Sequence, residues 1–137
     1  MIKKLSRNLV AAAAIVVAAA GVGVAGLAPI TDSSTSVVNP PPGQRRCKDL
    51  STKAYNNASI DDLVTNGHKV IFTFYRKPDL TSDYTEISNS GPEPVSSYST
   101  SVNAQSNPKL FPGYFRTCAR NPSQKPTTDS LTITVDR

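Results

Sequence analysis

The spacing of apolar residues after residue 45 limits this part of the chain to strands. Apolar side chains occur there in short runs, which Gly, Pro, Asn and Ser separate at intervals of about ten residues. No stretch sustains a helical period of apolar residues for as long as about three turns. The pattern predicts an all-β domain over residues 45–137, a sandwich or barrel of six to eight short antiparallel strands.

Residues 68–76 form the clearest strand in the sequence. Val70, Phe72 and Phe74 alternate onto one face, and Tyr75 helps to keep the other face partly apolar. A strand that is apolar on both faces is typical of the middle of a sheet, where neighbouring layers cover it. We therefore expect a central strand here.

The dipeptide Asn66-Gly67 stands directly before this strand. Asn-Gly is the preferred pair for a two-residue β-hairpin turn, and such a turn would pair Leu63 with Val70. A short helix is the alternative for the preceding segment, because residues 59–62 fit a capping box with Asp in place of Glu. The hairpin is our preferred interpretation.

The other strand candidates are short and mostly polar, which suits solvated faces or the edges of sheets. They are residues 50–58, 84–88, 95–103, 114–120 and 131–135, with turns at 90–94 and 112–113 and a polar connection at 121–128.

A positively charged start and a long apolar stretch open the chain. Lys3, Lys4 and Arg7 precede residues 9–28, which carry no charged side chain and are rich in Ala, Val and Gly. This arrangement is typical of a secretory signal peptide, which we assign to residues 1–28. An uncleaved membrane anchor is the alternative, because a stretch of this length can span a bilayer. Since Ala and Gly make it only weakly hydrophobic, we expect cleavage, export and no stable membrane span afterwards.

The leader also accounts for much of the composition. Residues 1–28 hold 20 of the 52 apolar residues, so that 32 remain among the following 109 residues. Without the leader the formal charge falls from +5 to +2, because three basic residues and no acid are lost. Residues 29–137 are therefore too few for two ordinary domains. Their nearly neutral charge also lacks the basic excess of a nucleic-acid-binding protein.

A polar segment, residues 29–44, lies between the leader and the first expected strand. Its Ser and Thr residues offer little to a core, and Pro40, Pro41 and Pro42 can continue neither a helix nor a central strand. We interpret this segment as a flexible linker that the prolines stiffen into an extended tether. A disordered N-terminus left after processing is the alternative.

Cys47 and Cys118 are the only cysteines. Two cysteines in an exported domain of this size are expected to pair, because the compartment is oxidising. Their wide separation does not suit a metal or redox pair, which would need a spacing such as C-x-x-C. We therefore expect a structural disulfide.

The residues around Cys118 predict where the disulfide lies. Strand alternation places Cys118 on the face of Arg116 and Arg120, opposite Phe115. Two arginines would be costly to bury beside a core cysteine. We expect the disulfide to attach Cys47, at the base of the linker, to an outer face or margin of a sheet.

Three passages, residues 64–75, 113–121 and 130–135, resemble strands of small secreted actinobacterial immunoglobulin-like β-sandwich domains. The resemblance implies an immunoglobulin-like antiparallel sandwich in an extracellular protein. The chain departs from that family in two respects. It has no tryptophan to pack on a core disulfide, and Arg116 replaces a tyrosine two residues before Cys118.

The chain offers few residues for catalysis or metal binding. His68 is the only histidine, and no G-x-S-x-G motif supplies an activated serine for it, so we expect an exposed turn residue. With the cysteines paired, a zinc site lacks its ligands. Asp79, Asp83 and Glu86 share one loop and leave weak Ca²⁺ binding open, although their spacing is not that of an EF-hand. We predict neither enzymatic activity nor a cofactor.

Tyrosine and arginine supply the best candidates for a binding surface, since a tyrosine ring combines contact area with a polar handle. The candidate ligand face comprises Tyr75, Tyr84, Tyr98, Tyr114, Arg116 and Arg120. The basic residues Arg45, Arg46, Lys48 and Lys53 either contact an anionic surface, such as wall polymers or lipid headgroups, or are simply solvated.

The function that follows is that of a secreted or cell-surface, non-catalytic binding module for an unknown protein or cell-envelope component. The alternative is a secreted inhibitor or antagonist of another protein, such as a protease. An inhibitor needs a rigid exposed loop, for which residues 90–94 and 107–113 are the candidates.

Overall fold

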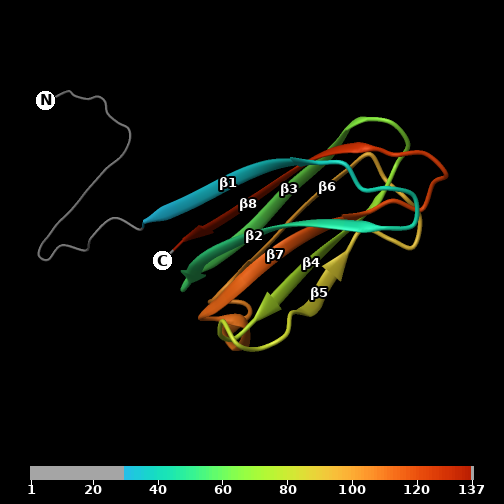
Figure 1. Ribbon diagram of the computed structural model, residues 1–137. Helices are drawn as coiled ribbons and strands as arrows, with labels where there is room; N and C mark the ends of the chain where they lie inside the picture. The colour runs from blue at the N-terminus through green and yellow to red at the C-terminus, as the bar shows by residue number, and fades with distance from the viewer. Residues whose placement is uncertain (1–29, 137) are drawn as a thin grey trace, which may run out of the picture. The chain divides into compact units, whose positions relative to one another are not determined.

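The computed structural model describes residues 30–136, which form eight β-strands and one short 3₁₀ turn, η1 (Pro108–Leu110) (Figure 1). The strands are β1 (Thr31–Val38), β2 (Arg45–Ala54), β3 (Asn57–Asn66), β4 (Ile71–Lys77), β5 (Thr85–Asn89), β6 (Ser97–Asn103), β7 (Gly113–Arg120) and β8 (Thr128–Asp136).

The strands make two four-stranded antiparallel sheets. The first sheet has the order β1-β8-β3-β6 and the second has the order β2-β7-β4-β5. Within residues 30–136, β4 and β5 are the only consecutive strands that share a sheet, and each other connection crosses from one sheet to the other (Figure 1). The predicted antiparallel β-sandwich is therefore confirmed.

The strand order differs from the immunoglobulin-like order that the resemblance implied. In an immunoglobulin domain the first two strands are neighbours in one sheet, whereas here β1 and β2 belong to different sheets. Eight strands that alternate between two four-stranded sheets in this way form a jelly roll. The local strand patterns of the two folds are alike, so the difference arises from long-range pairing.

Alternate residues of both sheets point inward and form the core. Leu131, Ile133 and Val135 of β8 face Phe72 and Phe74 of β4, and all five side chains are buried. β4 lies between β7 and β5, which confirms the prediction that this segment is a central strand. Its inward residues match those expected from the sequence.

The predicted hairpin at Asn66-Gly67 is wrong. Asn66 ends β3 in the first sheet, where it pairs with Thr128, and Gly67 begins a connection to the second sheet. Val70 forms a bridge with Val95 instead of pairing with Leu63. β3 lies between β6 and β8, and pairing with two neighbours outweighs the local turn preference of Asn-Gly. The helix considered for residues 59–62 is excluded as well, because these residues lie within β3.

The prediction of a flexible linker at residues 29–44 is also largely wrong. β1 occupies residues 31–38 and pairs with β8 along its whole length. Side-chain hydroxyls reinforce the pairing: Ser33 and Thr134 lie 2.8 Å apart (Oγ–Oγ1), and Thr35 and Thr132 lie 2.7 Å apart (Oγ1–Oγ1). Cross-strand Thr and Ser pairs stabilise a sheet without apolar burial. An edge strand can therefore form from residues that resemble a disordered segment.

The proline run forms a turn packed against the domain, not a stiff tether. The Gln44 N–H donates to the Pro41 carbonyl at 3.0 Å, and Gly43 has a φ of +74°, as the third position of a type II turn requires. Asn121 anchors the turn, since its side-chain amide donates to the Pro40 carbonyl at 3.0 Å. Residues 31–44 therefore belong to the sandwich.

The signal-peptide prediction falls on residues 1–28, outside the described part of the chain. Among residues 30–136 no helix is long and apolar enough to cross a bilayer.

Candidate functional site

The disulfide marks the outer face of the second sheet. Cys47 on β2 lies directly opposite Cys118 on β7, and the two cysteines are bonded. Phe115 and Ala119 of β7 point into the core, so alternation turns Cys118 to the outside of the sandwich, where Cys47 covers it. Both the pairing and its place on an outer face are confirmed, although Cys47 lies within a strand instead of at the base of a linker.

Registered rows of side chains surround the disulfide on this face. Arg45, Arg120 and Ile71 form one row across β2, β7 and β4. On the other side of the disulfide, Asp49, Arg116 and Tyr75 form the next row, which Glu86 of β5 extends. The face is therefore built from four strands that are far apart in sequence.

Cations lie over the tyrosine rings of this surface. The distances from the guanidinium carbon or the ammonium nitrogen to the ring centroid are 4.1 Å for Arg116 and Tyr84, 4.5 Å for Lys77 and Tyr84, 5.4 Å for Arg45 and Tyr75, and 5.7 Å for Lys53 and Tyr114. Contacts at these distances are attractive because the ring face is electron-rich. We call this surface the cation–tyrosine face; it comprises Arg45, Lys53, Tyr75, Lys77, Tyr84, Tyr114, Arg116 and Arg120.

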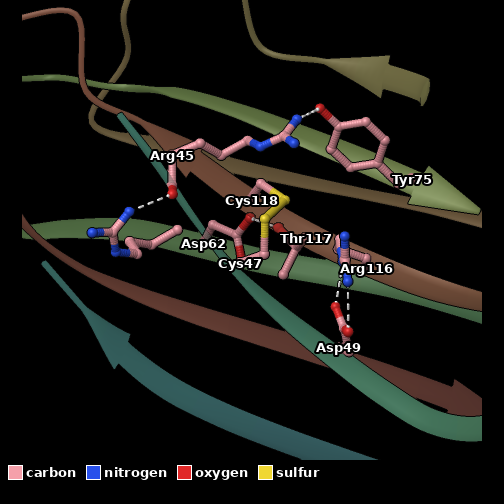
Figure 2. The surroundings of a disulfide bond; sticks show 9 residues. Arg45, Cys47, Asp49, Asp62, Tyr75, Arg116, Thr117 and Cys118 are labelled. Carbon is pink, nitrogen blue, oxygen red and sulfur yellow. Dashed lines mark hydrogen bonds and ion pairs between the residues drawn. A yellow bond between two sulfur atoms is a disulfide. The ribbon is translucent and has the colours of Figure 1, made fainter. Parts of the chain in front are cut away.

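An ion pair orients the centre of the cation–tyrosine face. The Arg116 guanidinium binds both carboxylate oxygens of Asp49, with Nη2 2.8 Å from Oδ2 (Figure 2). This hydrogen bond raises the pKa of Arg116, and burial together with the nearby Asp49 charge raises the pKa of Tyr84. Arg116 remains cationic and Tyr84 remains a neutral phenol near neutral pH, so the stacked arrangement persists.

A hollow of about 350 Å³ opens on the same face, beside the loop that follows β5. Arg45 and Tyr75 both line it, and Arg45 donates to the Tyr75 hydroxyl at 2.7 Å (Figure 2). Asn89, Pro92 and Arg120 also line it. We call this feature the arginine hollow.

Five of the six residues predicted as the ligand face belong to the cation–tyrosine face: Tyr75, Tyr84, Tyr114, Arg116 and Arg120. Tyr98 does not, because its ring packs against the apolar core between the sheets. Lys77 was not among the residues predicted for the ligand face, although its alternation with Tyr75 places both side chains on one face of the strand. It grouped Arg45 and Lys53 only as nearby basic residues, since their position relative to the tyrosines depends on the pairing of β2 with β7.

The predictions about His68 and calcium concern other parts of the surface. His68 is exposed, as expected, and lines a separate hollow of about 740 Å³ with Glu93 and Ser123 at one end of the sandwich. Asp79 accepts hydrogen bonds from the backbone N–H groups of Thr81 and Ser82 at 3.0 and 2.9 Å. Its carboxylate therefore stabilises the conformation of its own loop. In the described residues no three His, Cys, Asp or Glu side chains gather to hold a metal.

A buried carboxyl group lies beneath the cation–tyrosine face. Asp62 of β3 accepts a hydrogen bond from the Thr117 hydroxyl of β7, which joins the two sheets (Figure 2). It also accepts one from the Thr132 N–H at 3.2 Å. Burial raises the pKa of Asp62 to about 7 and also raises that of Asp129, which is buried nearby. The buried pair cannot be recognised from the sequence alone, because Asp62 resembles part of a polar turn unless β3 is recognised.

Comparisons with known proteins bear on the fold. No family model matches the chain, and no curated protein matches it. Among solved structures, the chain is similar to the Yersinia pseudotuberculosis-derived mitogen, with a TM-score of 0.51 and 14% sequence identity. The similar region covers 77% of this chain and 87% of the mitogen chain. At this identity the likeness shows a shared β-sandwich fold and nothing about activity.

Proposed function

We propose that this protein is a secreted or cell-surface, non-catalytic binding module whose cation–tyrosine face binds an anionic component of the cell envelope. The observation that carries the proposal is the charge of this surface. Five cations, Arg45, Lys53, Lys77, Arg116 and Arg120, lie on it, and Asp49 and Glu86 are the acidic residues of the same rows. The chain without its leader carries only +2, so the positive charge is concentrated on one face.

The aromatic part of the face supports the same function. Tyr75, Tyr84 and Tyr114 are each held by a cation, so their rings lose little freedom when a ligand covers them. Tyrosine is common in binding surfaces because it offers apolar area and a hydroxyl together. The disulfide supports an extracellular location, since disulfides persist in oxidising compartments.

Reversing the charge of two lysines on the cation–tyrosine face should weaken binding to anionic polymers. The exported protein is titrated against immobilised carboxylated, phosphorylated and neutral polysaccharides at low and physiological salt. We expect binding to the anionic polymers that weakens as salt rises. The Lys53→Glu/Lys77→Glu variant should bind about tenfold more weakly, since both ammonium groups lie on the face.

The matched control is Lys109→Glu/Lys125→Glu, which changes the net charge equally but alters exposed lysines outside the face, one in η1 and one in the connection before β8. It should retain most of the binding. Equal weakening in both variants would show that only net charge matters and would reject the face as a binding surface. Equal binding to neutral and anionic polymers would reject the anionic partner.

One observation favours the inhibitor as a second candidate function. The loop 107–113 is exposed over residues 107–109, and Arg76 holds its second half: the guanidinium donates to the carbonyls of Leu110 and Pro112 at 2.9 Å each. A loop held in this way presents a fixed conformation, which a protease inhibitor requires. Incubation with a panel of proteases tests the idea: stoichiometric inhibition with an intact loop supports it, and rapid cleavage within the loop without inhibition rejects it.

A further inference from the structure

We infer that the arginine hollow recognises the carboxylate of an acidic sugar unit, with Arg45 and Arg120 as the residues that bind the anion. The inference rests on the proposed function, because the hollow is part of the cation–tyrosine face. It adds the class of ligand and the residues that would select it.

The first argument is that Arg45 and Arg120 are neighbours whose positive charges no acidic side chain of the described residues pairs with. Arg45 and Arg120 lie directly opposite each other on β2 and β7, and like charges in this arrangement destabilise a sheet. Arg45 donates to the neutral Tyr75 hydroxyl. Within residues 30–136 the Arg120 guanidinium has neither a hydrogen bond nor an ion pair, and Arg116 forms the single ion pair of this region. A bound anion would relieve the repulsion.

The second argument is that the carboxylate of the hollow is already engaged. Glu86 accepts a hydrogen bond from the Asn89 side-chain amide, with Oε2 and Nδ2 2.7 Å apart. The Asn89 carbonyl oxygen in turn accepts from the Gly91 N–H at 2.8 Å. These bonds tie Glu86 to the loop at the side of the hollow. No ion pair joins Glu86 to Arg45 or Arg120 within residues 30–136, so the two guanidinium groups remain available to a ligand.

The third argument is the mixed lining, which matches a sugar better than a simple ion. Thr73, Tyr75 and Asn89 offer hydroxyl and amide groups that can exchange hydrogen bonds with sugar hydroxyls. Ile71 and Pro92 offer apolar area for the C–H face of a ring. A hollow of about 350 Å³ lies at the small end of ligand sites, which suits a single sugar unit.

The choice of a carboxylate follows from the geometry of arginine. A guanidinium group presents paired N–H donors in a plane, which match the two oxygens of a carboxylate. Phosphate also binds arginine, but a bare phosphate would leave the Thr73 and Asn89 groups and the apolar wall unused. A sugar that carries its carboxylate on the ring uses all three parts of the lining.

The test compares two probes that differ in one group. The exported protein is titrated with glucuronate, with glucose, which has a hydroxymethyl group in place of the carboxylate, and with inorganic phosphate. We expect glucuronate to bind at least tenfold more tightly than glucose, and more tightly than phosphate. Equal binding of glucose and glucuronate, or tighter binding of phosphate, would overturn the assignment.

Variants locate the site. Arg45→Gln and Arg120→Gln should each weaken glucuronate binding by tenfold or more, and Arg120→Lys should recover only part of the loss, since lysine keeps the charge without the planar pair of donors. Arg46→Gln is the matched control, because alternation turns Arg46 away from the hollow on the same strand. Unchanged glucuronate binding in both Arg→Gln variants would reject the hollow as the site.

The two proposals can fail separately. If Lys53→Glu/Lys77→Glu loses binding to anionic polymers while Arg45→Gln and Arg120→Gln retain it, the face is the binding surface and the hollow is not its sugar site. If neither set of variants affects binding to any anionic polymer, the proposed function is rejected and this inference with it.

Discussion

Replacing both cysteines by serine should lower the free energy of unfolding by about 4 kcal/mol, since the bond closes a loop across a sequence separation of 71 residues. A crosslink of this span removes many conformations from the unfolded chain. Its position adds to the effect, because β2 is an edge strand that pairs only with β7. The apolar core is small, so few other contacts can compensate for the loss.

Urea unfolding of the exported protein measures this effect. With a slope of about 1–3 kcal/mol per molar for a small protein, a loss of about 4 kcal/mol lowers the midpoint by more than about 1 M. Reduction of the native protein under the same conditions should reproduce most of the decrease, which controls for the two introduced hydroxyl groups. A midpoint within about 0.3 M of the native value would contradict the assignment of a structural role to the disulfide.

The second large effect is a loss of stability as the pH rises from about 4 to about 7. The pKa of Asp62 is raised from 3.8 to about 7 in the folded protein, so between these values the folded state binds more protons than the unfolded state. Stability from this group is therefore fully present below pH 3.8 and is lost as the pH rises through about 7. The rise of the Asp62 pKa from 3.8 to about 7 corresponds to about 4 kcal/mol.

Asp62→Asn should remove most of this pH dependence. An asparagine keeps an oxygen for the Thr132 N–H, and its amide can donate to the Thr117 hydroxyl. We expect the variant to be more stable than the native protein at pH 8 and to show a nearly flat stability profile between pH 4 and 7. The rest of the slope should come from Asp129, whose pKa is also raised by burial.

The neighbouring residue provides a matched control for this experiment. Asp61 is exposed on the outer side of β3, where it accepts a hydrogen bond from Ser99 at 2.7 Å. Asp61→Asn makes the same chemical change one residue away and should shift the pH profile only slightly, because the Asp61 charge is a minor cause of the raised pKa of Asp62. Equal profiles for Asp62→Asn and the native protein would mean that the buried carboxyl group does not titrate in this range.

Both effects depend on how few apolar groups the sandwich buries. The Asp62–Thr117 hydrogen bond occupies the middle of the core, since Phe115 of one apolar cluster and Ala119 of the other flank Thr117 on β7. A polar contact there joins the two sheets in one register, but it makes the charge state of a single carboxyl group important for stability. The disulfide then holds the outer surface of the same strand (Figure 2).

Patterns within single strands could be predicted from the sequence. Val70, Phe72 and Phe74 alternate in a way that depends only on the period of an extended chain, and the buried side of β4 follows from it. The same period, with the cost of burying Arg116 and Arg120, placed Cys118 on an outer face. Tyr75 and Tyr114 could likewise be assigned to a surface, because apolar neighbours in their own strands define the opposite face.

Pairing between distant segments was decided only by the tertiary structure. β1 carries no apolar alternation, and its strand conformation depends on the hydroxyl groups that β8 presents to it. Tyr98 belongs to a strand of mostly polar residues, so no local pattern shows which side is buried. Asn66-Gly67 favours a hairpin locally, yet β3 pairs with β6 and β8. The sequence by itself therefore determined the strands with an apolar face and the likelihood of a disulfide. The jelly-roll order, the buried Asp62 and the meeting of Arg45 with Arg120 required the folded chain, because each depends on contacts between residues that are far apart in sequence.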